Sequence, residues 1–230
     1  MDLADTGLHK PAATHYSIHE LLQNRWSPRA FEPRPVETEK LFSLFEAARW
    51  SPSGGNQQPW AFIVVLQENR EAFARLAELL NERNKIWASR APVLVLAIMR
   101  REYAPGRDNP FAAYDLGQAV AHLSIQAESM GLRVHQMGGF DAAKARESFN
   151  IPEGNDPLTV FAIGYHGNVD ALPAPLRERE HEERTRKPLN EFVFEQRWGE
   201  PLVPAKVSHI PRKGRTTNPA RFTLKIHSGP

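Results

Sequence analysis

Three short segments of the chain combine residue types that can bind an anion or a planar ligand. The first, residues 25–29 (Arg-Trp-Ser-Pro-Arg), puts two guanidinium groups and a hydroxyl at the end of a short predicted helix. Guanidinium groups bind phosphate through paired hydrogen bonds, and a serine hydroxyl adds a short one. The segment is therefore a candidate phosphate site. Taken alone, such a segment is more often an ordinary solvated basic turn.

The other two segments are rich in small and amide residues. Residues 51–60 (Ser-Pro-Ser-Gly-Gly-Asn-Gln-Gln-Pro-Trp) let the backbone approach a ligand closely and supply amide donors and acceptors. Such a loop suits a planar heterocycle with polar edge atoms. Residues 138–141 (Gly-Gly-Phe-Asp) end a predicted strand without side chains, which would let a backbone N–H contact a ligand. An ordinary loop and a tight turn remain the alternatives.

Composition narrows the kinds of chemistry that are possible. The 230 residues are 41% hydrophobic and 24% charged, which suits one globular domain with a sizeable core. The absence of cysteine excludes disulfides, thiolate nucleophiles and thiolate metal ligands. No HExxH, GxSxG, Walker loop or strand-linked GxGxxG occurs, and we expect no metal site.

The N-terminus and the apolar runs bear on location. The longest apolar run, residues 91–99, is far shorter than the ~20 residues of a spanning helix, and the N-terminus lacks a signal-peptide pattern. We therefore expect a cytoplasmic protein that does not enter a membrane.

Basic residues are concentrated near the C-terminus. Residues 197–230 hold seven basic residues and one acidic residue, so this segment carries +6 and the rest of the chain −4. Such a tail can attract nucleic acid, but it has few aromatic residues and no recognition element, so we expect no nucleic-acid partner. We predict a lead-in over residues 1–14, a domain over 15–198 and a flexible tail over 199–230.

Hydrophobic periodicity predicts alternating helices and strands. Helices are expected at residues 17–25, 37–49, 68–80, 113–130 and 141–149, and strands at 60–66, 92–99, 133–137 and 158–165. This order indicates a layered α+β or α/β fold. Residues 100–114 are predicted to form a loop or lid over a substrate, with Tyr103, Phe111 and Tyr114 as wall residues.

Taken together in their order, these motifs resemble the FMN-dependent nitroreductase family. The matching stretches include R-x-S-x-R at 25–29, PSGGNQQPW at 52–60, LNER at 80–83, DLG at 115–117, GGFD at 138–141 and RTRKPL at 184–189. They cover roughly residues 15–195. The resemblance implies an α+β nitroreductase-like fold, with a central mixed, mostly antiparallel sheet flanked by helices. It also implies an intertwined homodimer with active sites at the interface.

The resemblance also implies roles for individual residues. Arg29 would lie by flavin N1 and O2, and the Gly139 N–H near N5, which makes these two the catalytic candidates. Arg25 and Ser27 would meet the phosphate and ribityl chain. Further FMN contacts would come from Trp26, Pro52, Ser53, Gly54, Asn56, Asn81, Asp115, Gly138, Arg184 and Arg186. The contacts of residues 52–54 and of Asn81 would reach the flavin from the partner subunit. Some relatives have a glutamate where this chain has Gly138.

The implied activity is hydride transfer from NADH or NADPH through FMN to a small electron-poor acceptor, such as a nitroaromatic compound or a quinone, by a ping-pong mechanism. The same fold also supports flavin fragmentation, reductive dehalogenation and biosynthetic dehydrogenation, which remain alternatives. A nucleic-acid-binding protein acting through the basic tail is the third, weaker reading. Residues 190–198 are predicted to form an arm exchanged between subunits, because Phe192, Phe194 and Trp198 would be poorly placed on a free tail.

Overall fold

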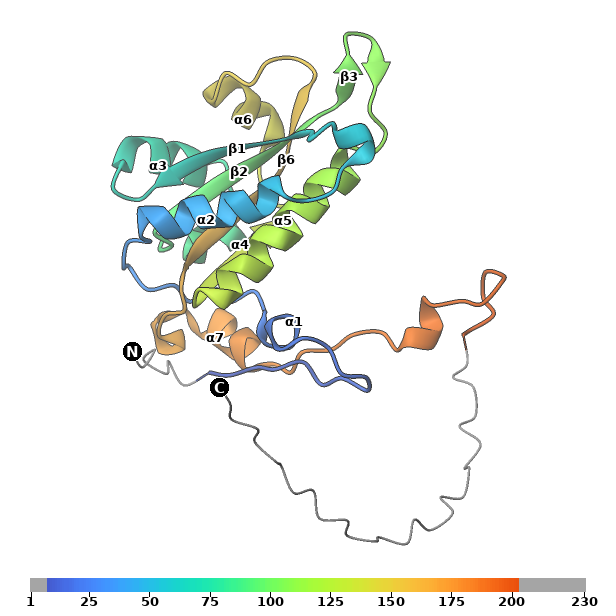
Figure 1. Ribbon diagram of the computed structural model, residues 1–230. Helices are drawn as coiled ribbons and strands as arrows, with labels where there is room; N and C mark the ends of the chain where they lie inside the picture. The colour runs from blue at the N-terminus through green and yellow to red at the C-terminus, as the bar shows by residue number, and fades with distance from the viewer. Residues whose placement is uncertain (1–7, 203–230) are drawn as a thin grey trace, which may run out of the picture. The chain divides into compact units, whose positions relative to one another are not determined.

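The computed structural model describes residues 8–202, and its centre is a four-stranded sheet (Figure 1). The strand order is β1-β2-β6-β5, and every pairing is antiparallel among the described residues. The expected sheet was mixed and mostly antiparallel, so the prediction of some parallel pairing is wrong for this part of the chain. The strands are β1 (Trp60–Leu66), β2 (Val93–Arg100), β5 (Leu132–Met137) and β6 (Asn155–Tyr165).

The two central strands are almost continuously apolar because both of their faces are covered. Val93 to Ile98 in β2 and Val160 to Tyr165 in β6 are buried, and Val95 pairs with Phe161 at the middle of the sheet. A run without alternation is typical of a strand buried on both sides. The edge strand β1 is only partly buried.

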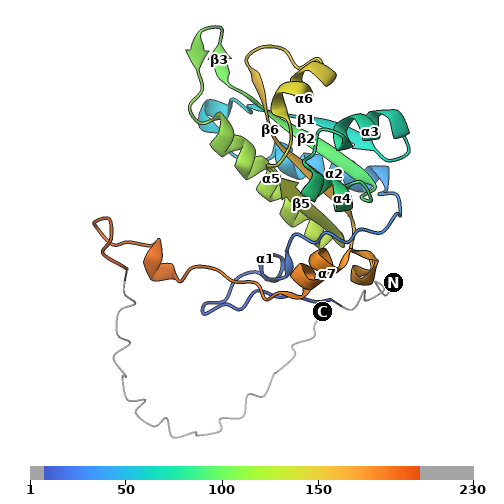
Figure 2. The same cartoon turned by 180° about the vertical axis from the view of Figure 1, so that it is seen from behind.

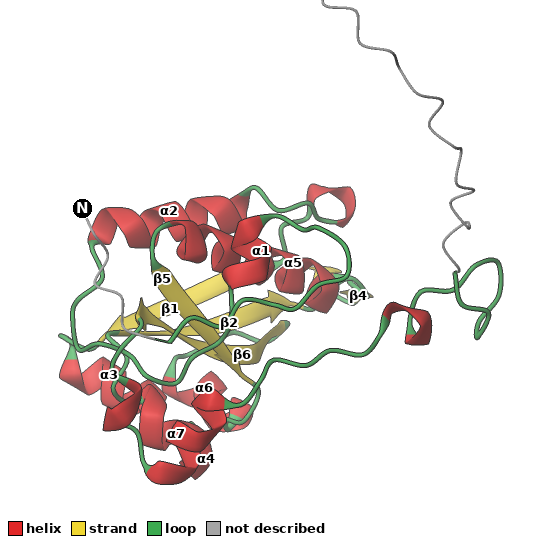
Figure 3. Ribbon diagram, turned by 90° about the horizontal axis from the view of Figure 1, so that it is seen from below, coloured by secondary structure: helices red, strands yellow, loops and turns green. Residues whose placement is uncertain are grey.

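Helices cover both faces of this sheet, giving three layers (Figures 2 and 3). Helices α2 (Thr38–Arg49) and α5 (Ala112–Ser129) pack on one face, where Leu44, Leu123 and Phe161 share a core. Helices α3 (Arg70–Ala77), α4 (Glu82–Ala88) and α6 (Ala142–Ser148) cover the other face. Two further short helices, α1 (Glu20–Asn24) and α7 (Ala174–His181), complete the set of α-helices in the described part of the chain.

Local signals set most of the helix ends that the sequence predicted. Helix α5 is followed by Gly131 at φ +73°, a left-handed conformation that glycine adopts easily. Asp141 caps α6 by accepting a hydrogen bond from the Lys144 N–H, as predicted. The helix expected over residues 68–80 is shorter, because the chain leaves α3 and Asn81 then caps a separate helix, α4.

Three elements differ from or extend the prediction. Residues 100–112, expected as a loop or lid, contain a small hairpin of β3 (Glu102–Ala104) and β4 (Arg107–Asp108). Helix α4 and helix α7 were not predicted. Three short 3₁₀ turns, η1 (Gly54–Asn56), η2 (Val169–Ala171) and η3 (Leu189–Glu191), lie in the connections.

The chain divides into two compact units, and the first ends at Arg184. This division falls before the boundary at 198 predicted from the sequence. Within the second unit, which begins at Thr185, the Phe194 and Trp198 rings lie 5.0 Å apart, and Trp198 is 92% exposed. Residues 1–7 of the predicted lead-in and 203–230 of the predicted tail lie outside the described residues. Over residues 8–202, no helix combines the length and apolarity needed to span a bilayer.

Candidate functional site

The loop at residues 25–29 follows α1 and gathers the predicted phosphate donors. An Arg25 NH1 group donates to Ser27 Oγ at 3.3 Å, so these two side chains lie together. The Trp26 ring is buried instead, with its edge against His166 and the Lys10 ammonium 4.9 Å from its centroid. The Trp26 side chain therefore anchors the loop in the protein.

Arg184 fastens the same loop from the end of the first unit. Its NH1 group donates to the carbonyls of Lys10 and Gln23 at 2.7 and 2.8 Å, and its NH2 group donates to the Arg25 carbonyl at 2.9 Å. These bonds bring the guanidinium next to Arg25, where a phosphate clamp was predicted. They also make Arg184 a structural tie between three backbone segments.

Arg29 is held by a carboxylate that the sequence did not single out. Its NH1 group lies 3.0 Å from Glu180 Oε1, and its backbone N–H donates to Glu180 Oε2 at 3.1 Å. The Glu180 side chain, on α7, is fully buried, whereas the Arg29 side chain is 22% exposed. The preceding Pro28 carbonyl lies 2.9 Å from His135 Nδ1, so that nitrogen carries the proton of the neutral ring.

Asn81 and Gly139 form the next part of the site. The Asn81 N–H donates to the Gly139 carbonyl at 2.9 Å, and Asn84 Nδ2 donates to the same oxygen at 3.3 Å. A Cβ on Gly139 would lie 2.0 Å from Asn81 Nδ2, so this close approach requires glycine. Among the described residues, the Gly139 N–H has no hydrogen-bond partner, and it remains available to a ligand.

A cavity of about 290 Å³ lies beside Arg29 and Asn81. Arg29 and Asn81 line it, together with Arg83, Asn84, Ile86, Trp87, Pro173, Pro175, Leu176 and Arg179. Half of the lining residues are apolar, the other half are arginines and asparagines, and the charged lining groups are all arginines. The volume is at the lower end for ligand cavities, so the cavity can take only the end of a nucleotide-sized ligand.

The loop at residues 51–60 belongs to a second cluster. The Gly54 N–H donates to the buried carboxylate of Asp115 at 3.1 Å, and Phe111 lies beside Gly54. Ser51 Oγ lies 2.8 Å from His122 Nδ1, which ties the start of the loop to α5. Pro52, Asn56 and Tyr114 are exposed around this cluster, and Ser53 is half-buried.

The loop at residues 51–60 and the loop at residues 25–29 lie at opposite ends of α5 (Figure 1). Asp115 is in the first turn of the helix, whereas Glu128 is in its last turn. Burial raises the pKa of Glu128, and the charges of Arg133, Arg25 and Arg184 act against that rise, so the phosphate candidates lie near this last turn. Thirteen residues separate the two positions along the helix, or roughly 20 Å at about 1.5 Å per residue.

Several predicted residues are placed differently from the expectation. Asn81, expected to act from the partner subunit, lines the same cavity as Arg29 of its own chain. Tyr103 lies on the small hairpin under the Arg107 guanidinium. Gly138 is exposed, with open space where a side chain would be. Arg186 belongs to the second unit, where its NH1 group donates to the Thr185 carbonyl.

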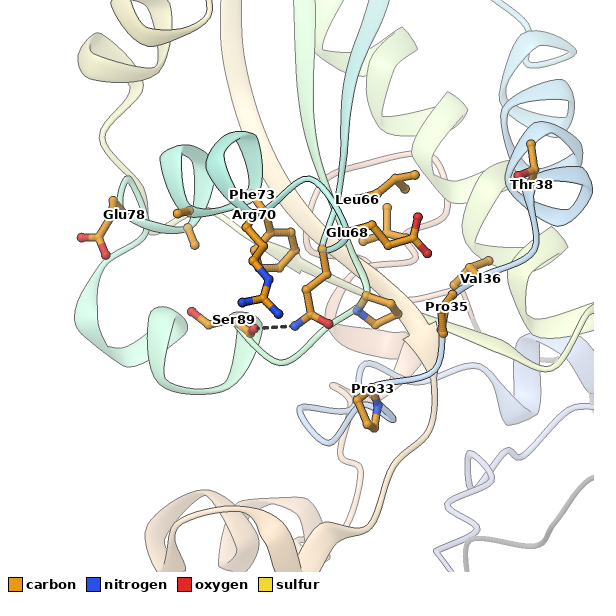
Figure 4. Close-up of a pocket in the computed structure, with 15 residues that line it drawn as sticks. Pro33, Pro35, Val36, Thr38, Leu66, Glu68, Arg70, Phe73, Glu78 and Ser89 are labelled. Carbon is orange, nitrogen blue, oxygen red and sulfur yellow. Dashed lines mark hydrogen bonds between the residues drawn. The ribbon is translucent and has the colours of Figure 1, made fainter.

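A larger cavity lies elsewhere, and none of the predicted site residues lines it. It has a volume of about 880 Å³ and lies between the segment around Pro33 and Pro35, the end of β1, and α3 (Figure 4). Gln67 Nε2 donates to the Ser89 carbonyl at 3.2 Å within it. No group of three or more potential metal-ligating side chains occurs among the described residues.

Comparison with known proteins decides the family. Residues 22–165 match the nitroreductase family. The chain belongs to the nitroreductase family. A 15.4 kDa protein from Mycolicibacterium smegmatis, described as uncharacterized, is 37% identical over 57% of this chain and 88% of its own length. A "Putative NADH dehydrogenase/NAD(P)H nitroreductase" from Methanothermobacter thermautotrophicus is 29% identical over 64% of this chain and 76% of its own.

Solved nitroreductase-family structures share the fold. A crystal structure described as an "oxidoreductase containing FMN" superposes with a TM-score of 0.78 at 34% identity, covering 82% of this chain and 96% of its own. A family member from Clostridium difficile gives 0.61 at 28% identity, covering 77% and 96%. Membership of this family supports an oxidoreductase built on an α+β fold with an antiparallel sheet.

The residues present fit the chemistry of FMN. Ser27, Arg25 and Arg184 supply hydroxyl and guanidinium donors suited to a phosphate. For the flavin ring, the cavity offers Arg29 and the Asn81 side chain beside the unpaired Gly139 N–H. These groups suit a planar heterocycle with acceptor atoms at its edge.

Proposed function

We propose that this protein is an FMN-dependent oxidoreductase that passes hydride from NADH or NADPH to a small electron-poor acceptor by a ping-pong cycle. The observation that carries the proposal is the cluster of Arg25, Ser27 and Arg184 beside the cavity lined by Arg29 and Asn81, within a fold shared with an FMN-containing oxidoreductase. When bound, FMN supplies the hydride chemistry, because its N5 can accept and donate hydride.

The chain's own residues bind and orient the cofactor in this proposal. Arg25, Ser27 and Arg184 hold the phosphate, and the Gly139 N–H donates to the flavin edge near N5. Arg29 places positive charge at the pyrimidine edge, where negative charge gathers on reduction; a fixed cation stabilises that charge in a partly dry site. We expect Arg29→Ala to lower the flavin potential and turnover more than FMN affinity. Unchanged turnover in FMN-saturated Arg29→Ala protein would contradict this role.

The proposal includes a homodimer whose two subunits share each site. Support comes from the roughly 20 Å along α5 between Asp115, which accepts the Gly54 N–H, and Glu128, on which the charges of Arg25 and Arg184 act. Two exposed apolar side chains, Phe42 on α2 at 72% exposure and Trp50 just after it at 74%, offer a surface for a second copy. Sedimentation at micromolar concentration should give a dimer, and a monomer would contradict the shared site.

The visible absorption spectrum of the purified protein, followed by anaerobic titration with NADH and NADPH, tests the proposed function. We expect flavin bands that bleach with at least one of the two reductants. A flavin that stays oxidised with both would redirect the proposal to flavin fragmentation, dehalogenation or dehydrogenation on the same fold. A colourless protein that cannot be reconstituted with FMN would overturn the cofactor assignment.

A further inference from the structure

Glu180 is a site residue that the family motifs do not explain. Both of its carboxylate oxygens accept hydrogen bonds from one residue, Arg29, through NH1 at 3.0 Å and through the backbone N–H at 3.1 Å. Its side chain is 0% exposed, and Arg29 is its only ion-pair partner among the described residues. The Lys10 ammonium hydrogen-bonds the main-chain carbonyl of Glu180, which fixes the end of α7. Two hydrogen bonds to one buried carboxylate restrict where Arg29 can lie, and the Lys10 charge also acts on that carboxylate.

Arg29 has donors left over for a ligand. A guanidinium carries five N–H donors, and only its NH1 group is hydrogen-bonded among residues 8–202. The remaining donors are on a side chain that is 22% exposed and that lines the cavity beside Asn81. One end of the guanidinium is therefore fixed by Glu180, while the other can reach a ligand in the cavity.

The electrostatic consequence has a definite sign. Arg29 presents positive charge to the cavity, and the Glu180 carboxylate directly behind it opposes that charge. In a partly dry site, such opposition is weakly screened. Glu180 should thus orient Arg29 and also reduce the stabilisation that Arg29 gives to an anion in the cavity.

We propose that Glu180 is a positioning residue that fixes Arg29 toward the pyrimidine edge of the flavin and sets the net charge there, so that it holds the flavin potential down. This rests on the proposed FMN-dependent function. The variant Glu180→Gln keeps the shape and one acceptor for Arg29 but removes the negative charge. Reduced FMN should then bind more tightly relative to oxidised FMN by roughly tenfold, a rise of about 30 mV in the two-electron midpoint potential.

Glu178→Gln is the matched control. Glu178 is exposed on the same helix, it makes no side-chain hydrogen bond or ion pair among the described residues, and its substitution changes the net charge equally. The midpoint potential of FMN bound to each variant is measured by anaerobic reduction against a reference dye, beside the FMN dissociation constant and thermal unfolding of the FMN-free protein. We expect a higher potential in Glu180→Gln and none of this shift in Glu178→Gln.

The other outcomes separate the possible failures. If FMN binds and is reduced but Glu180→Gln leaves the potential unchanged, the role of Glu180 is overturned while the proposed function stands. Equal rises in both variants would overturn it too, since net charge alone would explain them. A wild-type protein that takes up no FMN overturns both. If Glu180→Gln does not fold, the variant Arg29→Gln is compared with the double variant Arg29→Gln/Glu180→Gln, in which the two new amide side chains can pair. The double variant must have the higher flavin midpoint potential, and equal potentials refute the role of Glu180.

Discussion

Replacing Gly139 by alanine tests the packing at the centre of the site. The new Cβ would lie 2.0 Å from Asn81 Nδ2 and 2.9 Å from Asn81 Cγ, whereas an ordinary contact begins at 3.4 Å. The Asn81 side chain must therefore move. It is not free to do so without loss, because its Oδ1 caps α4 by accepting the Asn84 N–H at 2.9 Å.

The magnitude follows from that cap. Losing an asparagine N-cap costs about 0.5–2 kcal/mol, typically ~1. Against this, alanine in place of glycine restricts the unfolded chain and stabilises by about 0.4–1 kcal/mol where the backbone allows it. Gly138 isolates this second effect, because a Cβ there meets nothing within 4 Å. Gly138→Ala should thus be neutral or slightly stabilising, and Gly139→Ala should be less stable than Gly138→Ala by about 1–2 kcal/mol.

Urea unfolding of the FMN-free protein, followed by tryptophan fluorescence, measures the difference without any contribution from ligand binding. The variant Asn81→Ala removes both the cap and the clashing amide. Adding Gly139→Ala to Asn81→Ala should therefore cost little more, giving a coupling energy of about 1 kcal/mol. Equal stability of Gly138→Ala and Gly139→Ala, or fully additive costs in the double variant, would refute the packing described here.

Three further predictions concern groups around the site and the core. Burial lowers the pKa of His135 to about 4. As the pH falls from 6.5 to 4, the unfolded state takes up a proton first, so the free energy of unfolding drops by up to about 3 kcal/mol. Urea unfolding at several pH values in this range should show a smaller drop in His135→Gln. Arg184→Ala leaves three backbone carbonyls without their donor and should lower the thermal midpoint, whereas Arg186→Ala should not. The Tyr165 hydroxyl, 2.5 Å from Glu37, lowers the pKa of that carboxyl to about 2, and Tyr165→Phe should raise it in an NMR titration.

Much of the fold could be predicted because its strands and main helices are locally encoded. The apolar runs at β2 and β6 have few alternatives to a buried strand, and Asp141 marks the start of α6 through its own side chain. Helices α4 and α7 were not predicted, for two different reasons. The first is only seven residues long and continues the pattern of the preceding helix, and the second is so charged that Glu180 is its only fully buried residue.

The candidate site was predictable where recognition depends on contiguous residues. R-x-S-x-R and GGFD place Arg25, Ser27 and Gly139 through short motifs. The pairing of Arg29 with Glu180 joins positions 151 residues apart, and a glutamate in a highly charged segment carries no sign of burial. The same limit applies to Arg184, which hydrogen-bonds main-chain carbonyls that any sequence would supply.

The length of α5 bears on the proposed homodimer and on how two subunits would share each site. Asp115 lies in the first turn of the helix and Glu128 in its last, so the loop held by Asp115 and the groups around Glu128 stay roughly 20 Å apart in one chain. In a homodimer with a twofold axis the interface is self-complementary, so each contact between the two copies occurs twice. The homodimer proposed above would then hold two equivalent sites, with Arg29 and Glu180 supplied by one subunit and residues 52–54 by the other.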